Sequence, residues 1–110
     1  MKHVLRIEPD YDVLFFDEED VAWEDLDGLY DKQGNPIDMP ELIEWQREIH
    51  PIVIASETGE PYEKDWADYH RRGLELANQL RERLSTDFDL WYSPPFEDKS
   101  GIISKRILIL

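Results

Sequence analysis

The longest regular pattern in the chain is an apolar stripe at helical spacing between Pro61 and Leu84. Its members follow one another at steps of three or four residues, with a single step of one, which places them on one face of an α-helix. They are Trp66, Tyr69, His70, Gly73, Ala77, Leu80 and Leu84. Acidic residues precede the stripe, and Arg81 and Arg83 occupy its last turn, so both ends suit the helix macrodipole. The pattern predicts one long helix from Pro61 to about Leu84.

Gly73 is the exception within this stripe, because glycine in a helix costs about 1 kcal/mol relative to alanine. Its place on the apolar face predicts a close approach by another element. His70 lies on the same face. We expect it to be hydrogen-bonded and half-buried, with a general base as the alternative interpretation.

Strand-like patterns occupy both ends of the chain. Residues 3–8 alternate, and residues 12–17 are apolar on both faces, which is typical of an inner strand. We expect these two segments to form a hairpin around residues 8–11. In residues 87–93 the side chains alternate between the two faces of a predicted strand, and Trp91 faces away from Phe88, Leu90 and Tyr92. Either Trp91 or the other three side chains are therefore exposed, unless both faces of the sheet are covered. Residues 102–110 are predicted as a final strand, either internal or paired with a second subunit.

The middle of the chain is less regular. Residues 18–37 are expected to form an irregular segment pinned by Trp23 and Leu29, with a turn at residues 32–36. Asp38 and Glu41 have the spacing of a capping box, which predicts a helix from there to about His50, ended by Pro51. Residues 52–55 are then a short strand or a buried connector.

These elements predict an α+β fold in a single domain, residues 1–110. Their order is β-β-α-α-β-β, and the simplest architecture is an antiparallel sheet of about four strands with two helices packed on one face. At 110 residues and 41% hydrophobic composition, the chain can bury a substantial core.

The amino-acid composition excludes several kinds of chemical site. The chain has no cysteine, which excludes disulfides, thiolate nucleophiles and cysteine-ligated metal centres. No signal peptide and no membrane-spanning run is recognisable, so a cytoplasmic protein is expected. Three isolated histidines form no metal-binding pair, and no nucleophile, phosphate-loop or dinucleotide motif is present. No cofactor, metal ion or catalytic residue is therefore predicted, and a non-enzymatic protein is expected.

Two sets of residues match metal-site motifs only in part. Asp25, Asp27 and Gly28 match only a fragment of a calcium-binding loop. Pro9-Asp10 and Glu97-Asp98-Lys99 resemble the halves of a metal-dependent nuclease motif. The second half lies in a predicted turn, and the chain is strongly acidic, which does not suit binding to a polyanion.

Charge is the most informative property for function. The formal net charge is −14, and the segment from Glu8 to Asp31 contains 11 acidic residues and no lysine or arginine. Such a surface repels nucleic acid and attracts a basic partner, although acidic surfaces can also serve only solubility. The predicted partner-binding residues are acids with two aromatic anchors: Glu8, Asp10, Tyr11, Asp12, Asp17, Glu18, Glu19, Asp20, Trp23, Glu24, Asp25 and Asp27.

Two stretches, Leu5-Arg-Ile-Glu-Pro-Asp-Tyr11 and Gly73-Leu-Glu-Leu-Ala-Asn-Gln-Leu-Arg-Glu-Arg-Leu84, look like those of small uncharacterised bacterial proteins. In size, acidity and lack of cysteine the chain also resembles, in type, the immunity proteins and antitoxins of bacterial toxin systems. This resemblance implies an inhibitor of a basic protein, with a nuclease toxin as one candidate. The alternatives are a housekeeping or homo-oligomeric structural protein, in which case a homodimer is expected, and a small hydrolase that uses carboxylates and His70.

Overall fold

A computed structural model describes residues 3–110 of the chain. These residues form one mixed sheet with the strand order β3-β2-β1-β4-β5. The strands are β1 (His3–Ile7), β2 (Phe15–Asp17), β3 (Ala22–Trp23), β4 (Phe88–Tyr92) and β5 (Ile107–Ile109). The helices are α1 (Pro40–Arg47), α2 (His50–Thr58) and α3 (Trp66–Arg83). The predicted α+β class is confirmed.

The sheet is neither purely antiparallel nor four-stranded, so that part of the prediction is wrong. The central pair β1 and β4 is parallel, with Leu5 opposite Leu90, while the other three pairs are antiparallel. The physical reason is the connection between them. The chain leaves β2 and β3, passes through all three helices and then returns beside β1, and such a long crossover allows parallel pairing.

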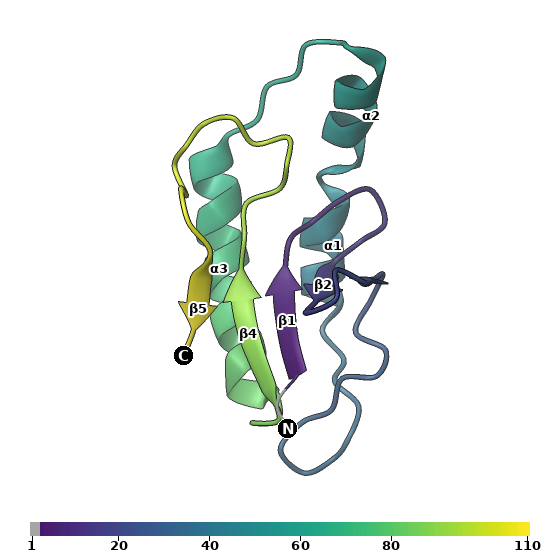
Figure 1. The fold of residues 1–110 in the computed structure, drawn as a ribbon, viewed down its shortest axis with the longest axis vertical. Coiled ribbons are helices and arrows are strands. Elements are labelled where there is room, and N and C mark those ends of the chain that lie inside the picture. The colour runs from purple at the N-terminus through teal and green to yellow at the C-terminus, as the bar shows by residue number, and fades with distance from the viewer. Residues whose placement is uncertain (1–2) are drawn as a thin grey trace.

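Helices α1 and α3 lie behind the same face of the sheet, whereas α2 extends past the ends of the strands (Figure 1). Burial alternates accordingly. Leu5 and Ile7 of β1 are fully buried, as are Leu90 and Tyr92 of β4. Trp91 lies on the opposite face and is only partly buried. One face of the sheet therefore forms the core with the helices, and the other has no helix over it.

The helix boundaries differ from the prediction at two prolines, Pro40 and Pro51. The N-cap of α1 is Met39 rather than Asp38, with no side-chain cap, because Pro40 takes the first helical position. Pro51 does not terminate a helix but lies in the first turn of α2, where its missing N–H does no harm. Residues 52–55 are consequently helical, not a strand or connector.

Helix α3 is shorter than its apolar stripe indicated. It begins at Trp66, where the side chain of Asp65 accepts a hydrogen bond from the backbone N–H of Asp68 at 3.1 Å. Its 18 residues span about 27 Å. The expected burial of the stripe is confirmed, since Trp66, Tyr69, Gly73, Ala77 and Leu80 are all buried. His70, expected to be half-buried, is buried more deeply, at 2% exposed.

The predicted last strand is also too long. Only Ile107–Ile109 pairs with β4, and β5 is an edge strand rather than an internal one. Residues 18–37 agree better with expectation: they contain the short strand β3, a bridge between Tyr30 and Pro36, and the buried Leu29. No helix within residues 3–110 is long and apolar enough to cross a membrane.

Candidate functional site

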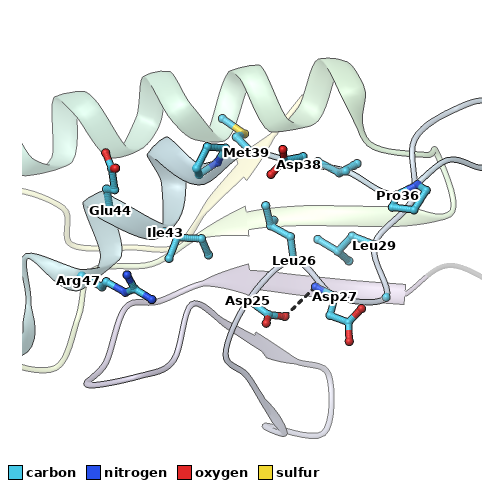
Figure 2. A pocket seen from close by; sticks show the side chains of 13 residues that line it. Asp25, Leu26, Asp27, Leu29, Pro36, Asp38, Met39, Ile43, Glu44 and Arg47 are labelled. Carbon is cyan, nitrogen blue, oxygen red and sulfur yellow. Dashed lines mark hydrogen bonds between the residues drawn. The ribbon is translucent and has the colours of Figure 1, made fainter.

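A pocket of about 510 Å³ lies between the loop at residues 25–29, the segment 36–39 and the outer side of α1 (Figure 2). Leu26 and Ile43 face each other in it, from the loop and from the helix. Its lining residues are Asp25, Leu26, Asp27, Gly28, Leu29, Pro36, Ile37, Asp38, Met39, Pro40, Ile43, Glu44 and Arg47.

Local hydrogen bonds fix the loop wall of this pocket. The side chain of Asp25 accepts from the backbone N–H of Asp27 at 2.8 Å, and the N–H of Leu29 donates to the carbonyl of Leu26 at 3.1 Å. Gly28 between them has a positive φ of 89°, which a side chain would disfavour. The sequence Asp25 to Leu29 therefore folds as a tight turn that places two carboxylates outside and two leucines inside.

The floor and the rim of the pocket differ in polarity. Leu26, Leu29, Ile37 and Met39 are buried and form an apolar floor, and Ile43 of α1 is partly buried beside them. The rim has four exposed carboxylates, Asp25, Asp27, Asp38 and Glu44, against a single guanidinium, that of Arg47. Such a site suits a lysine or arginine side chain, whose methylene groups can be buried while its charge meets the rim.

Four of the predicted acids belong instead to the β2–β3 hairpin. Asp17 accepts from the backbone N–H groups of Glu19 and Val21 at 2.9 and 3.0 Å and from the Trp23 indole at 3.2 Å. The bond from Val21 contributes most to lowering the pKa of Asp17, and the other two act in the same direction. Glu18 accepts from the N–H of Val4 at 3.3 Å. Asp17 and Trp23 thus hold the hairpin together.

The predicted residues around the β1–β2 turn also have partners within the chain. Arg6 bonds Glu8 at 3.2 Å and Asp20 at 3.1 Å, so its single positive charge offsets part of their negative charge. The ring of Tyr11 stacks on His50 at 4.5 Å between centroids, and Asp12 lies 3.4 Å from the same imidazole.

The twelve predicted residues therefore do not form one site. Asp25 and Asp27 line the pocket, Glu24 is exposed next to them, and Glu19 is exposed at the hairpin tip. The carbonyl of Asp10 accepts from the Gln46 side chain at 2.6 Å, which ties the β1–β2 turn to α1. Trp23 is partly buried and packs against the core, as expected.

Sequence reasoning missed the helix side of the pocket, formed by Asp38, Ile43, Glu44 and Arg47. Ile43 is only partly buried, unlike its neighbours Leu42 and Trp45 on the same helix. In the sequence, the only sign of this side of the pocket is an isoleucine that borders the apolar face of the helix and precedes a glutamate. The approach of the 25–29 loop to this helix could not be inferred from either segment alone.

His70 lies deep in the protein rather than in a cleft. Its imidazole is 2.7 Å from the hydroxyl of Tyr92 through Nδ1 and 2.6 Å from Asp98 through Nε2. The side chains of His70 and Asp98 are both almost completely buried. This arrangement connects α3 to the β4–β5 loop and satisfies the histidine, which favours a structural role over that of a general base.

The parallel pairing of β1 and β4 brings the Pro9-Asp10 turn and the Glu97-Asp98-Lys99 turn to the same end of the sheet. Their side chains are nevertheless used differently from those of a nuclease. Asp98 bonds His70, and the ammonium group of Lys99 lies 3.9 Å from the centroid of the Phe96 ring. Among residues 3–110, no cluster of three or more histidine, aspartate or glutamate side chains has the arrangement of a metal site.

A second hollow, of about 460 Å³, lies on the helix-free face of the sheet beside Trp91. Arg6 and Arg106 contribute bases, and Asp17, Glu18 and Asp20 contribute acids. Arg6 also lies 5.3 Å from the centroid of the Phe16 ring. This face is therefore partly covered by arginine side chains, and its charges are mixed rather than predominantly acidic.

No protein-family model matches the chain, and neither a curated protein nor a solved structure with significant similarity to it was found.

Proposed function

We propose that this protein binds a cationic protein and receives one of its basic side chains in the pocket between residues 25–29 and α1. The observation that supports this most directly is the combination of an apolar floor with four rim carboxylates and one arginine. An inhibitor of the immunity or antitoxin type, acting on a basic toxin such as a nuclease, would use such a surface.

The distribution of charge supports the same proposal. The acid-rich segment 8–31 runs along the β2 side of the sheet, the side away from β5 (Figure 1). Some cations away from the pocket are paired with acids of the chain: Arg72 bonds Glu48 at 2.6 Å and Asp68 at 2.9 Å, and Arg71 bonds Asp68 at 2.6 Å. At the pocket rim, four exposed carboxylates lie beside the single guanidinium of Arg47, and this local excess of negative charge can accelerate encounter with a basic partner.

A direct test is a titration followed by NMR amide shifts. The probe is a short peptide of arginines around one tryptophan, and its control is the same peptide with glutamate in place of arginine. We expect the basic peptide to perturb residues 25–29 and 36–47 most strongly and the acidic one to perturb none. Perturbations confined to other parts of the surface would contradict the proposed site.

The variant for this titration is Asp27→Lys with Glu44→Lys, which reverses two exposed rim charges. Its matched control is Glu57→Lys with Glu60→Lys, the same change in net charge at exposed positions at the end of α2. Loss of at least about tenfold in affinity, in the first variant only, is expected for two reversed charge contacts. Equal losses in both variants would mean that only net charge is recognised.

A further inference from the structure

Within residues 3–110, strand β5 forms an apolar edge of the sheet and pairs on one side only, with β4. Ile107 and Leu108 are 37% and 41% exposed, and Ile102 and Leu110 are also exposed. An edge strand of this kind offers free backbone N–H and C=O groups to another strand. Natural edge strands are usually protected by charge, proline or a bulge, and residues Ile107 to Leu110 contain no charged residue and no proline.

Charge distinguishes this edge from the opposite one. The β3 edge is flanked by Asp17, Glu18, Glu19 and Asp20 on one side and by Glu24, Asp25 and Asp27 on the other. By contrast, residues 99–110 contain three bases and no acid. For two copies of a chain with a net charge of −14, the β5 edge is the part of the sheet where they can approach without opposing carboxylates.

We propose that two copies of this chain pair through antiparallel β5 strands, forming a continuous ten-stranded sheet across a two-fold axis. An axis through Leu108 places Leu108 opposite Leu108, and it places Ile107 of one copy opposite Ile109 of the other. These are cross-strand apolar pairs, which stabilise antiparallel sheets. The interface is self-complementary, as a two-fold dimer requires.

The same register separates like charges. Lys105 and Arg106 precede β5, so the antiparallel arrangement places the basic ends of the two strands at opposite ends of the interface. Arg106 then lies opposite residue 110 of the second copy. Position 89 of β4 is next to residue 110 in the β4–β5 register, so the carboxylate of Asp89 lies on the neighbouring strand of that second copy. A groove of about 440 Å³ at this end is lined by Glu82, Asp89 and Leu108 to Leu110, together with Lys32 and Arg81 among others.

This dimer is independent of the proposed binding of a cationic protein. It uses the edge of the sheet opposite to the acidic pocket, so both pockets stay accessible in the dimer. A partner with two copies of its basic segment would then gain affinity from bivalent binding.

The test is the mass in solution, measured by light scattering coupled to size-exclusion chromatography at about 100 μM chain. The wild-type protein is expected to be a dimer. Leu108→Lys and Leu108→Glu, each alone, are expected to be monomeric, because like charges would face each other across the axis. An equal mixture of the two variants is expected to form a heterodimer, since lysine then faces glutamate. The matched control is Ile54→Lys, an exposed apolar residue on α2, which should stay dimeric.

Three results would overturn the proposal: a wild-type monomer at this concentration, single Leu108 variants as dimeric as the wild-type protein, or a mixture that stays monomeric. Circular dichroism of each variant establishes that it is folded. Leu108 is partly exposed on the helix-free face, so neither substitution buries a charge.

Discussion

At the scale of single residues, Gly73 determines how closely α3 approaches its neighbours. The indole of Trp45 donates to the carbonyl of Tyr69 at 2.9 Å and stacks on the Tyr69 ring at 4.5 Å between centroids. A Cβ at position 73 would collide with the Trp45 ring and would lie 2.8 Å from the hydroxyl of Tyr92. The close approach predicted from the sequence is therefore confirmed, and its partners are two aromatic side chains.

Gly73→Ala is expected to destabilise the protein by about 1–3 kcal/mol, since overpacking a rigid core outweighs the gain in helix propensity of about 1 kcal/mol. Urea unfolding measures this difference. The control is Asn78→Ala, at an exposed position of the same helix, which should change the free energy of unfolding by less than about 0.5 kcal/mol. A more stable Gly73→Ala variant would show that Trp45 moves aside easily.

Glu97 is a second residue with a measurable consequence. It is 6% exposed, and its Oε2 atom has no hydrogen-bond partner among residues 3–110. Burial raises the pKa of Glu97, and the negative charges of Asp10 and Glu57 add to that shift. Because the pKa is higher in the folded than in the unfolded protein, ionisation of this carboxyl opposes folding. The cost is absent at low pH and grows as pH rises through the folded-state pKa.

We therefore expect Glu97→Gln to be stabilised relative to the wild-type protein at pH 7 and to lose that advantage near pH 4. Thermal unfolding of both proteins across this range is the measurement. Glu63→Gln, at an exposed glutamate, serves as the control and should follow the wild-type curve. A difference between Glu97→Gln and wild type that does not vary with pH would contradict a raised pKa for Glu97.

At the scale of elements, the β4–β5 loop is held by two anchors. Asp98 bonds His70 of α3, and the hydroxyl of Tyr62 donates to the carbonyl of Glu97 at 2.8 Å. Burial would raise the pKa of Asp98, but hydrogen bonds from Ser100 and His70 outweigh it and lower the pKa overall. The stabilisation from this carboxylate is thus present above its unfolded-state pKa and is lost as pH falls through the folded-state value.

Asp98→Asn is expected to cost about 1.5–3 kcal/mol, the range for a hydrogen bond to a charged group, and to loosen this loop selectively. Hydrogen exchange at pH 7 should show faster exchange in residues 96–106 and unchanged protection in the middle of α3. The control Lys99→Ala, at the neighbouring exposed residue, should leave hydrogen exchange unchanged both in residues 96–106 and in α3. Equal acceleration throughout the protein would mean that the bond supports the whole fold rather than this loop.

Periodicity located the elements better than it located their ends or their directions. The patterns around His3–Ile7, Phe88–Tyr92 and α3 were strong enough to identify each element, because alternation and helical spacing reflect which side chains are buried. Pro51 was misinterpreted because a proline can end one helix or begin the next, and the choice depends on packing of Ile52 and Val53. The parallel pairing of β1 with β4 depends on the path of the whole chain between them, which no local pattern contains.

At the scale of the whole molecule, the amino-acid composition predicted that the surface is negatively charged, but not where acidic side chains lie close together. Acids of the hairpin bond partners within the chain, as Asp17 does with Val21 and Trp23, although Glu18, Glu19 and Asp20 remain exposed. The pocket instead combines Asp25 and Asp27 with Glu44, which comes from a helix that folds back against their loop. Two segments that are separate in the sequence form the rim together, and only the fold brings them together.

The proposed function requires that this rim binds a basic protein. The most direct measurement is affinity capture from the native host at low salt with three baits: the wild-type protein, Asp27→Lys/Glu44→Lys and Glu57→Lys/Glu60→Lys. Elution with salt rising from about 0.1 to 1 M shortens the screening length from roughly 10 to 3 Å and releases charge-dependent partners. We predict one basic protein retained by the wild-type protein and by the Glu57→Lys/Glu60→Lys control but not by the rim variant. Retention of the same protein by all three baits, or of no basic protein by any, would contradict the claim.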